Sequence, residues 1–210
     1  MKKKIAILGS TGSIGKSLLK IIKKDKKNFE VKLLTAKSNY KKLFEQAKIF
    51  NVKNLIITEK KYFEIAKKKK IKNKINIYND FDSLIKIFPN KIDYTMSSIM
   101  GIEGLKPSLD IIRFTKKIVI ANKESIVCGW PLIKDKLKRY KTEFLPVDSE
   151  HFSIWYALKK ENIENVERIY ITASGGPFLN TPIKRLKRIK LSQALKHPNW
   201  KMGKKISIDS

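Results

Sequence analysis

A strand, a glycine turn and a helix follow one another at the start of the chain, and this succession constrains the fold more than any other feature. The apolar run IAIL at residues 5–8 precedes the stretch GSTGSIG at residues 9–15. Apolar residues then recur at positions 18, 19, 21 and 22, which is the spacing of one helix face. A strand that ends in glycines and leads directly into a helix is typical of a βαβ unit in a parallel sheet.

The alternation of short apolar runs with amphipathic stretches continues along the chain. It predicts an α/β fold built on a Rossmann-like, doubly wound parallel sheet. The expected strands are residues 5–8, 31–35, 54–58, 75–78, 93–98, 117–121, 142–147 and 167–173. The expected helices are residues 17–24, 40–50, 80–88, 104–114, 131–141 and 152–160. A polar cluster ends the alternating series, so we place a domain boundary between 1–147 and 148–210.

The net charge of +28, from 47 Lys and Arg against 19 Asp and Glu, raises the question of a polyanionic partner. The lysines are spread along the whole chain, and the run KKKKIKNK at residues 67–74 has no aromatic or glycine residues for base stacking. We therefore expect no nucleic-acid partner, and a surface field that favours small anionic ligands. A basic nucleic-acid-binding protein is the alternative that net charge alone would support.

The start of the chain and its cysteine content indicate a cytoplasmic protein. MKKKIAILGS turns glycine-rich after a few apolar residues and lacks the apolar region of a secretory signal, so we expect a mature cytoplasmic start. Nor does the sequence contain an apolar run long enough for a membrane span, and we expect no membrane partner. Cys128 is the single cysteine, which excludes an intrachain disulfide and suits a reducing compartment.

Three glycines stand between the first strand and the first helix. Gly9, Gly12 and Gly15 form a GxxGxxG pattern in the context that a dinucleotide fingerprint requires. Glycines there let the backbone turn tightly and approach a pyrophosphate, whose charge meets the free N–H groups of the helix N-terminus. A plain tight turn is the structural alternative, although it would not need three glycines.

The end of the second strand distinguishes between two cofactors. NAD sites usually place an acid about 20 residues after the glycines, where it holds the ribose 2′-hydroxyl. Here that region reads TAKSN and has no acid. It offers a lysine, a hydroxyl and an amide instead, at Lys37, Ser38 and Asn39. Since a lysine and a hydroxyl suit a 2′-phosphate, we expect NADP(H) rather than NAD(H).

Two polar clusters follow later strands. Asn122, Lys123 and Glu124 come directly after the run KIVIA, at the edge of the sheet where doubly wound folds bind ligands. Asp148 and Glu150 are two residues apart, so both carboxylates face one side of an extended strand end. Such hard oxygen ligands suit Mg²⁺ or Mn²⁺. An ordinary exposed strand end is the structural alternative for the first cluster.

His151, which follows Glu150, is expected to open a helix rather than to bind metal, since its side chain points away from the two carboxylates.

Two further segments suit anion binding and closure. Ser174 precedes two glycines in TASGGPF, where a hydroxyl and exposed amides are available to an anion. The loop-like segment at residues 195–210 has a tryptophan flanked by Pro, Asn and Gly, which fits a mobile lid or a core tryptophan.

The motifs GSTGSIG, ANKES, LPVDSEH, ASGGPF and HPNWKMGKKISIDS occur together and in this order. This set resembles 1-deoxy-D-xylulose 5-phosphate reductoisomerases, from the first strand to the last residue. The resemblance implies an NADPH domain followed by the start of an α+β catalytic domain. It also implies a divalent metal (Mn²⁺, Mg²⁺ or Co²⁺), a homodimer, and the conversion of 1-deoxy-D-xylulose 5-phosphate to 2-C-methyl-D-erythritol 4-phosphate in non-mevalonate isoprenoid biosynthesis.

The resemblance also implies roles for individual residues. The implied cofactor contacts are Thr11, Gly12, Ser13, Ile14, Lys37, Ser38, Asn39, Asn122, Glu124 and Gly203. The implied metal ligands are Asp148 and Glu150. The implied substrate contacts are Lys123, Ser149, Glu150, Ser174, His197, Trp200 and Ser210, with Trp200 and Met202 in a closing flap. The implied catalytic residues are Lys123, Asp148, Glu150 and His197.

Two departures from the family pattern matter. The family usually reads AGKN after the second strand, whereas this chain reads AKSN, so Lys37 stands at the glycine and Ser38 at the lysine. The family also continues as ATMMNKGLE where this chain stops at Ser210. That segment carries a third carboxylate ligand and an Asn–Lys pair for the substrate phosphate, so we expect the 210 residues to be a fragment. The remaining alternative is a nucleotide-binding module without catalysis.

We predict that the purified 210-residue polypeptide does not turn over substrate, because two protein carboxylates do not complete a metal site. The measurement is NADPH oxidation in the presence of the phosphosugar and Mn²⁺. A rate near that of longer family members would contradict this prediction.

Overall fold

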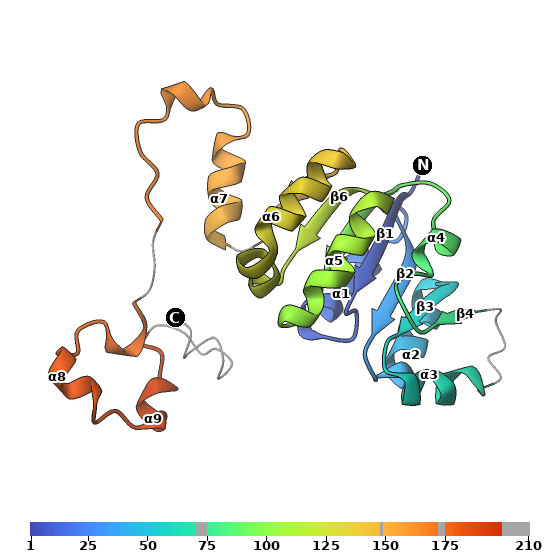
Figure 1. Ribbon diagram of the computed structural model, residues 1–210, viewed down its shortest axis with the longest axis horizontal. Coiled ribbons are helices and arrows are strands. Elements are labelled where there is room, and N and C mark those ends of the chain that lie inside the picture. Colours follow the sequence, from blue (N-terminus) through green and yellow to red (C-terminus); the bar gives the residue numbers. More distant parts are fainter. Residues whose placement is uncertain (70–74, 148, 172–174, 199–210) are drawn as a thin grey trace. The chain divides into compact units, whose positions relative to one another are not determined.

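The computed structural model describes residues 1–69, 75–147, 149–171 and 175–198 (Figure 1). The chain divides into two compact units, Met1–Trp155 and Tyr156–Ser210. The predicted boundary after residue 147 stays a prediction. Predicted residues or parts of segments that lie outside the described residues are Asp148, residues 172–173 of the last expected strand, Ser174, Trp200, Met202, Gly203 and Ser210.

The first unit is built on a seven-stranded sheet in which every pairing is parallel. Its strands are β1 (Lys3–Leu8), β2 (Phe29–Ala36), β3 (Asn54–Ile57), β4 (Asn76–Tyr78), β5 (Ile92–Ser97), β6 (Thr115–Ile120) and β7 (Glu143–Leu145). The helices that connect them are α1 (Ser13–Lys24), α2 (Tyr40–Phe50), α3 (Lys60–Lys67), α4 (Leu84–Ile87), α5 (Leu105–Ile111) and α6 (Lys123–Arg139). The predicted doubly wound parallel sheet is confirmed.

The strand order is β4-β3-β2-β1-β5-β6-β7, so the chain builds outward from β1 first on one side and then on the other. Ile5 pairs with Val31 of β2 on one side and with Tyr94 of β5 on the other. The point between β1 and β5 is therefore the topological switch point of the sheet. Ligands of open α/β sheets bind outside the carboxyl ends of the strands at such a point.

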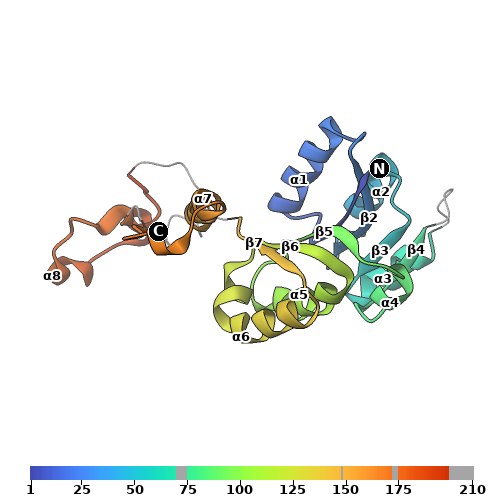
Figure 2. The same cartoon turned by 90° about the horizontal axis from the view of Figure 1, so that it is seen from above.

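Two hydrophobic layers hold the sheet between its helices (Figure 2). Side chains of α1, α2 and α3, such as Leu19, Leu43 and Ala66, cover one face. Side chains of α4, α5 and α6, such as Leu84 and Ile133, cover the other. Because both faces are covered, the central strands read as continuous apolar runs, and residues 6–8 of β1 have no exposed surface.

The structure differs from the sequence prediction at three places. Helix α3 was missed, because four of the eight residues in KKYFEIAK are Lys or Glu and only one of the eight is buried. Helix α6 begins at Lys123, whereas the prediction placed its start at residue 131. A proline favours the first helical turn, but Pro131 lies inside this helix. The strand expected at 167–173 is wrong in its described part, since residues 167–171 pair with no strand. An alternating apolar pattern forms a strand only where a neighbouring strand accepts its hydrogen bonds.

The second unit contains short elements. Beyond the end of α7 (Ser149–Leu158) it holds two 3₁₀ turns, η3 (Ile163–Asn165) and η4 (Gly176–Phe178), and two single-turn helices, α8 (Ile183–Leu186) and α9 (Leu191–Ala194). Several large apolar side chains between these elements are exposed, including Tyr170 at 78% and Ile171 at 64%. In the described residues no helix is both long and apolar enough to cross a lipid bilayer.

Asp93, the second residue of β5, links this strand to the start of β1. Its carboxylate accepts a hydrogen bond from the backbone N–H of Lys4 at 2.8 Å and one from Lys116 Nζ at 3.1 Å. The backbone N–H of Lys4 is the main cause of a pKa for Asp93 below its usual value; burial opposes this shift, and Lys116 adds to it. The folded state therefore favours the charged form of this carboxylate.

We predict that Asp93→Asn lowers the free energy of unfolding by about 1–2 kcal/mol at pH 7, toward the low end of the range of about 1.5–3 kcal/mol for a hydrogen bond to a charged group, because the carboxylate is partly exposed. Because the pKa of Asp93 is depressed in the folded state, its contribution is present above the unfolded pKa and is lost as the pH falls through the folded pKa. Urea unfolding from pH 7 down to about pH 3 should show the gap between the two proteins closing. Asp135→Asn, at an exposed position of α6, is the control. An equal gap at both pH values would contradict the prediction.

Candidate functional site

The turn between β1 and α1 is shaped by two glycines that no other residue could replace without strain. Gly9 has a φ of +78°, and a Cβ there would lie 2.9 Å from the backbone oxygen of Ser98. A Cβ on Gly15 would lie 2.6 Å from the Cα of Ser10. The turn therefore packs backbone to backbone against the end of β5 on one side and against the first turn of α1 on the other.

A buried hydrogen-bond network fixes the same turn from the side of β2 and α2. The hydroxyl of Thr35 accepts from the N–H of Gly9 at 2.9 Å, and the N–H of Ser10 donates to the carbonyl of Thr35 at 2.9 Å. The Ser10 hydroxyl donates to Gln46 Oε1 at 2.7 Å, while Gln46 Nε2 donates to the Ser10 carbonyl at 2.9 Å. All three side chains are buried. Gln46 was not predicted as a site residue: its place in the apolar stripe of α2 indicates burial, but its hydrogen-bond partner lies 36 positions away.

The first turn of α1 faces the end of β1 with its backbone amides. Gly12 is the N-cap and provides no side-chain hydrogen bond to the helix. The first turn has no acidic residue, and the last turn has Lys23 and Lys24. Ser13 and Ile14 are exposed, and the first N–H groups of any helix have no partner within it. The start of α1, where no side chain caps the helix, therefore offers its backbone amides and the positive end of the helix dipole to an anion.

The end of β2 carries the three residues predicted for a 2′-phosphate. Lys37 Nζ lies 3.0 Å and 3.1 Å from the two carboxylate oxygens of Glu103. Asn39 Oδ1 accepts from the N–H of Lys42 at 3.1 Å and caps α2. Ser38 is half-buried, and its carbonyl accepts from the N–H of Tyr40. Of the three residues, Asn39 therefore caps a helix, and Lys37 forms an ion pair with an acidic residue.

Asn122 connects the ends of β5 and β6. Its Nδ2 donates to the carbonyls of Ile99 and Gly101, at 2.6 Å and 2.5 Å, and its Oδ1 accepts from the N–H of Ser125 at 3.1 Å. The side chain is 4% exposed, so this amide caps α6 and holds the loop after β5. A Cβ on Gly104 would lie 2.5 Å from the Asn122 Nδ2, so the loop packs closely against this amide.

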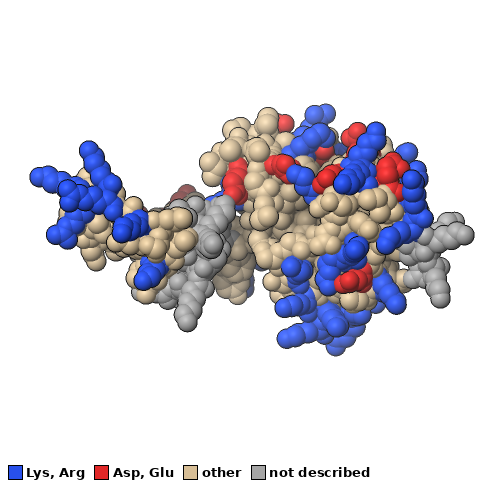
Figure 3. All heavy atoms as spheres, turned by 90° about the horizontal axis from the view of Figure 1, so that it is seen from below, with Lys and Arg blue, Asp and Glu red and all other residues tan. Residues whose placement is uncertain are grey.

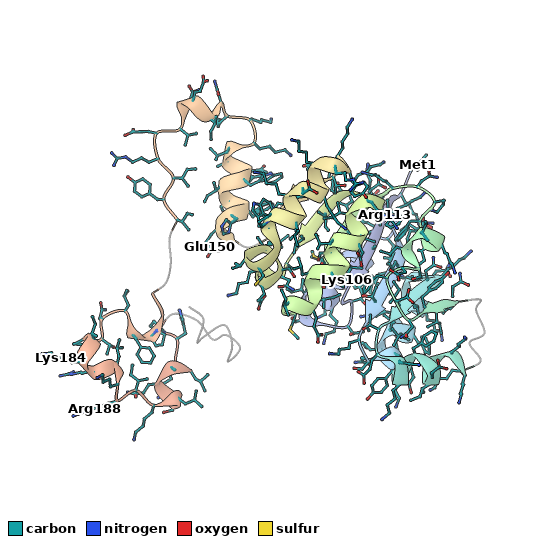
Figure 4. The ribbon with its side chains drawn as sticks, in the orientation of Figure 1. Met1, Lys106, Arg113, Glu150, Lys184 and Arg188 are labelled. Atoms are coloured by element: carbon teal, nitrogen blue, oxygen red, sulfur yellow. The ribbon has the colours of Figure 1, made fainter. Side chains whose placement is uncertain are left out.

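The other predicted residues lie beyond β6. Lys123 is exposed and Glu124 is half-buried, and both belong to the first turn of α6. Ser149 and Glu150 begin α7, where Glu150 is exposed (Figure 4). The extended strand end that was expected to turn the carboxylates of Asp148 and Glu150 to one side is therefore wrong at Glu150, because β7 ends at Leu145 and Glu150 is helical. His151 is exposed on α7, as expected for a residue near a helix start, and His197 is half-buried after α9. Within the described ranges, no group of three or more His, Cys, Asp or Glu side chains is placed to hold a metal ion.

The basic side chains do not gather into one stripe on the face shown in Figure 3. Lys and Arg are spread over that face of the Met1–Trp155 unit, with acidic side chains between them. Among the described residues several acids form ion pairs with lysines, as in Lys106–Asp110 and Lys117–Glu143. A nucleic-acid-binding protein would concentrate positive charge along one path, and this face shows no such path.

The parallel sheet, the switch point beside β1 and the glycine turn define a Rossmann-like nucleotide-binding domain. The family model for 1-deoxy-D-xylulose 5-phosphate reductoisomerase matches residues 5–129. The model for the C-terminal domain of 1-deoxy-D-xylulose 5-phosphate reductoisomerase matches residues 144–210. The chain belongs to the 1-deoxy-D-xylulose 5-phosphate reductoisomerase family.

Individual relatives agree with this assignment. The reductoisomerase of Pelagibacter ubique (strain HTCC1062) is 63% identical over 210 residues, which are 99% of this chain and 54% of the relative. The corresponding protein of Wolbachia pipientis subsp. Culex pipiens (strain wPip) is 41% identical and matches over 99% of this chain and 53% of its own length. The chain thus spans about half the length of the curated relatives it matches.

Two solved structures share the fold over nearly the whole chain. The Zymomonas mobilis reductoisomerase in complex with NADPH superposes with a TM-score of 0.87 at 36% identity, covering 100% of this chain and 54% of that one. A reductoisomerase in complex with NADPH, fosmidomycin and magnesium gives a TM-score of 0.80 at 33% identity, covering 99% of this chain and 54% of that one.

We predict that Gln46→Leu lowers the free energy of unfolding by about 1–3 kcal/mol, because the Ser10 hydroxyl and carbonyl would lose their buried partner. Lys48→Leu, at an exposed position of the same helix, should change it by less than about 0.5 kcal/mol. Urea unfolding at pH 7 measures both. Equal stabilities of the two variants would show that the network does not hold the turn.

Proposed function

We propose that this chain binds NADPH across the carboxyl end of β1 and that it serves the reductoisomerase reaction of its family. The observation that carries the proposal is the glycine turn at the switch point. There Gly9 and Gly15 pack the backbone so closely that α1 begins directly over the end of β1. Two solved relatives that hold NADPH support the choice of ligand.

The pyrophosphate of NADPH would lie on the first turn of α1. The amides of Ser13 and Ile14 and the hydroxyl of Thr11 would be the donors there, and no acidic residue of that turn would repel the ligand. The Gly12 amide donates to the Gly9 carbonyl at 3.1 Å, so Gly12 would contribute by letting the pyrophosphate come close to the backbone. Lys37 would meet the 2′-phosphate at the end of β2, with Ser38 beside it. Asn39 would contribute by capping α2 with its side chain and so fixing the backbone of this segment.

The nicotinamide end would lie toward β5 and β6. Asn122 would position this part of the site by holding the carbonyls of Ile99 and Gly101. Glu124 would contact the cofactor from the first turn of α6, and Gly203 is proposed to reach it from outside the described residues. Lys123, exposed at the start of the same helix, would face the substrate.

A divalent metal, Mg²⁺, Mn²⁺ or Co²⁺, is proposed on Asp148 and Glu150. Carboxylate oxygens are the donors that such hard cations prefer, and a related structure contains magnesium. When bound, the metal would polarise the carbonyl oxygen of the substrate. Glu150 opens α7 with an exposed side chain, in a position open to a ligand.

The proposed substrate is 1-deoxy-D-xylulose 5-phosphate. Its skeleton would rearrange to an aldehyde, and a hydride from NADPH with one proton would reduce this aldehyde to 2-C-methyl-D-erythritol 4-phosphate, a step of isoprenoid biosynthesis. Lys123 and His197 would hold the substrate and, with Asp148 and Glu150, form the catalytic set. The other proposed substrate contacts are Ser149, Ser174, Trp200 and Ser210.

Three further features are proposed with this function. The NADPH domain would end at residue 147 and the metal- and substrate-binding domain would begin at residue 148. The protein would act as a homodimer in the cytoplasm. Family membership supports these proposals, as does the single cysteine for a reducing compartment.

We predict that the 210-residue chain binds NADPH and that Ser13→Asp weakens this binding at least about tenfold. The new carboxylate would stand in the first turn of α1, where it favours the helix but repels a pyrophosphate. NADPH fluorescence titration measures the Kd, and thermal unfolding confirms that the helix is intact. Binding is the readout because the chain spans about half the length of its relatives.

Ser17→Asp is the matched control, since it adds the same charge at an exposed position one turn later in α1. Its Kd should stay within about twofold of the unchanged protein, because helix-end effects fall off within the first turn. Two results would contradict the proposal: no binding of NADPH by the unchanged chain, or equal Kd values for the two variants.

A further inference from the structure

One ion pair spans the end of the sheet where the cofactor is proposed to bind. Lys37 follows β2 directly, and Glu103 lies in the 3₁₀ turn η1 (Ile102–Gly104) that follows β5. Both carboxylate oxygens of Glu103 lie within 3.1 Å of Lys37 Nζ. The two residues are 66 positions apart in the sequence, so the fold rather than the local chain brings them together.

The sheet order determines what this pair crosses. β2 and β5 are the two neighbours of β1, so their ends stand about 10 Å apart, which is two strand spacings. The ion pair therefore joins the segments on either side of the carboxyl end of β1. A dinucleotide that lies across this end, with its 2′-phosphate toward β2, meets the lysine of the pair and the carboxylate together.

Both partners of the pair stand on fixed backbone and carry exposed side chains. The loop of Glu103 is fixed, because Asn122 holds two of its carbonyls and Gly104 packs against the same amide. Lys37 follows the last residue of β2, and its carbonyl accepts from the N–H of Glu59 at 3.1 Å. The two side chains are 63% and 64% exposed, so the lysine can turn its ammonium toward a competing anion while the loop keeps Glu103 beside the site.

We propose that Glu103 is a specificity-determining residue, which competes with the 2′-phosphate of NADPH for Lys37 and so reduces the preference for NADPH over NADH. This inference rests on the proposed function. NADPH must take Lys37 away from Glu103 and then keep its phosphate, with a charge of about −2, near a carboxylate. NADH carries a neutral 2′-hydroxyl and leaves the ion pair in place.

The solvent exposure of Glu103 determines how much this residue can change the Kd of NADPH. The side chain of Glu103 is 64% exposed, so water and salt screen both its attraction for Lys37 and its repulsion of a phosphate. Exposed pairs of this kind correspond to about two- to fivefold in affinity, and the direct repulsion of the phosphate adds to it. A three- to tenfold effect on the Kd of NADPH is therefore expected at low ionic strength.

The test is Glu103→Gln in the 210-residue chain, with the Kd of NADPH and of NADH measured by fluorescence titration. The Kd of NADPH should fall about three- to tenfold at 20 mM salt and change less at 500 mM, while the Kd of NADH changes less than about twofold. Glu143→Gln is the matched control. It removes the same charge from an ion pair with Lys117 at the opposite end of the strands, and neither Kd should change.

A double-mutant cycle separates competition for Lys37 from general charge effects. Lys37→Met should weaken NADPH binding, and in that background Glu103→Gln should improve it by less than about twofold. An undiminished improvement in that background would overturn the proposal, as would an NADPH Kd that is unchanged or raised in Glu103→Gln alone. If the unchanged chain does not bind NADPH, that result contradicts the proposed function, and this inference, which rests on it, is contradicted too.

Discussion

The structure depends on how tightly the chain turns after β1. This strand lies between β2 and β5, where the two halves of the sheet meet, so the segment leaving it has neighbours on both sides. Gly9 makes contact with the backbone of Ser98 on the β5 side, and Ser10 is held by Thr35 and Gln46 on the β2 side. A buried turn with unpaired amides would cost more than these contacts contribute, so the hydrogen bonds are as necessary as the glycines. The position of α1, and of the anion site proposed at its N-terminus, follows from them.

The same geometry explains which parts of the molecule could be predicted from the sequence. Strands buried on both faces read as unbroken apolar runs, and residues 5–8, 54–58 and 117–121 were therefore recognised. The glycine turn was recognised because its residue type follows from a local backbone need. Gln46 was missed because its role depends on a serine 36 positions away, which no local pattern reveals. Residues 167–171 had the alternation of a strand, but a strand also needs a partner, and partners are a property of the fold.

The candidate site contains two kinds of residue: those that position the backbone, and those whose side chains are proposed to contact a ligand. Asn39 and Asn122 both cap helices that begin at the carboxyl edge of the sheet, and both are fixed by hydrogen bonds within the protein. Lys37 and Glu103 stand beside them with exposed, charged side chains. The sequence motifs do not separate these two kinds of residue, since Asn39, which caps a helix, and Lys37, which is proposed to meet a phosphate, stand two positions apart. Their partners separate them, because Asn39 Oδ1 accepts from a backbone N–H of its own helix, whereas Lys37 Nζ pairs with the side chain of Glu103 across the end of the sheet.

The place of β1 in the sheet also affects how the protein folds during its synthesis. β1 is made first, yet its contact with β5 joins residues 89 positions apart, as in the hydrogen bond from Lys4 to Asp93. At about 5–20 residues per second, the ribosome needs roughly 4 to 18 s to make that stretch. During this time one side of β1, whose last four residues are apolar, has no neighbour, and it can pair with another nascent chain instead. The six lysines among the first 23 residues and the ones that follow give such chains a strong positive charge, and mutual repulsion keeps them apart until β5 arrives.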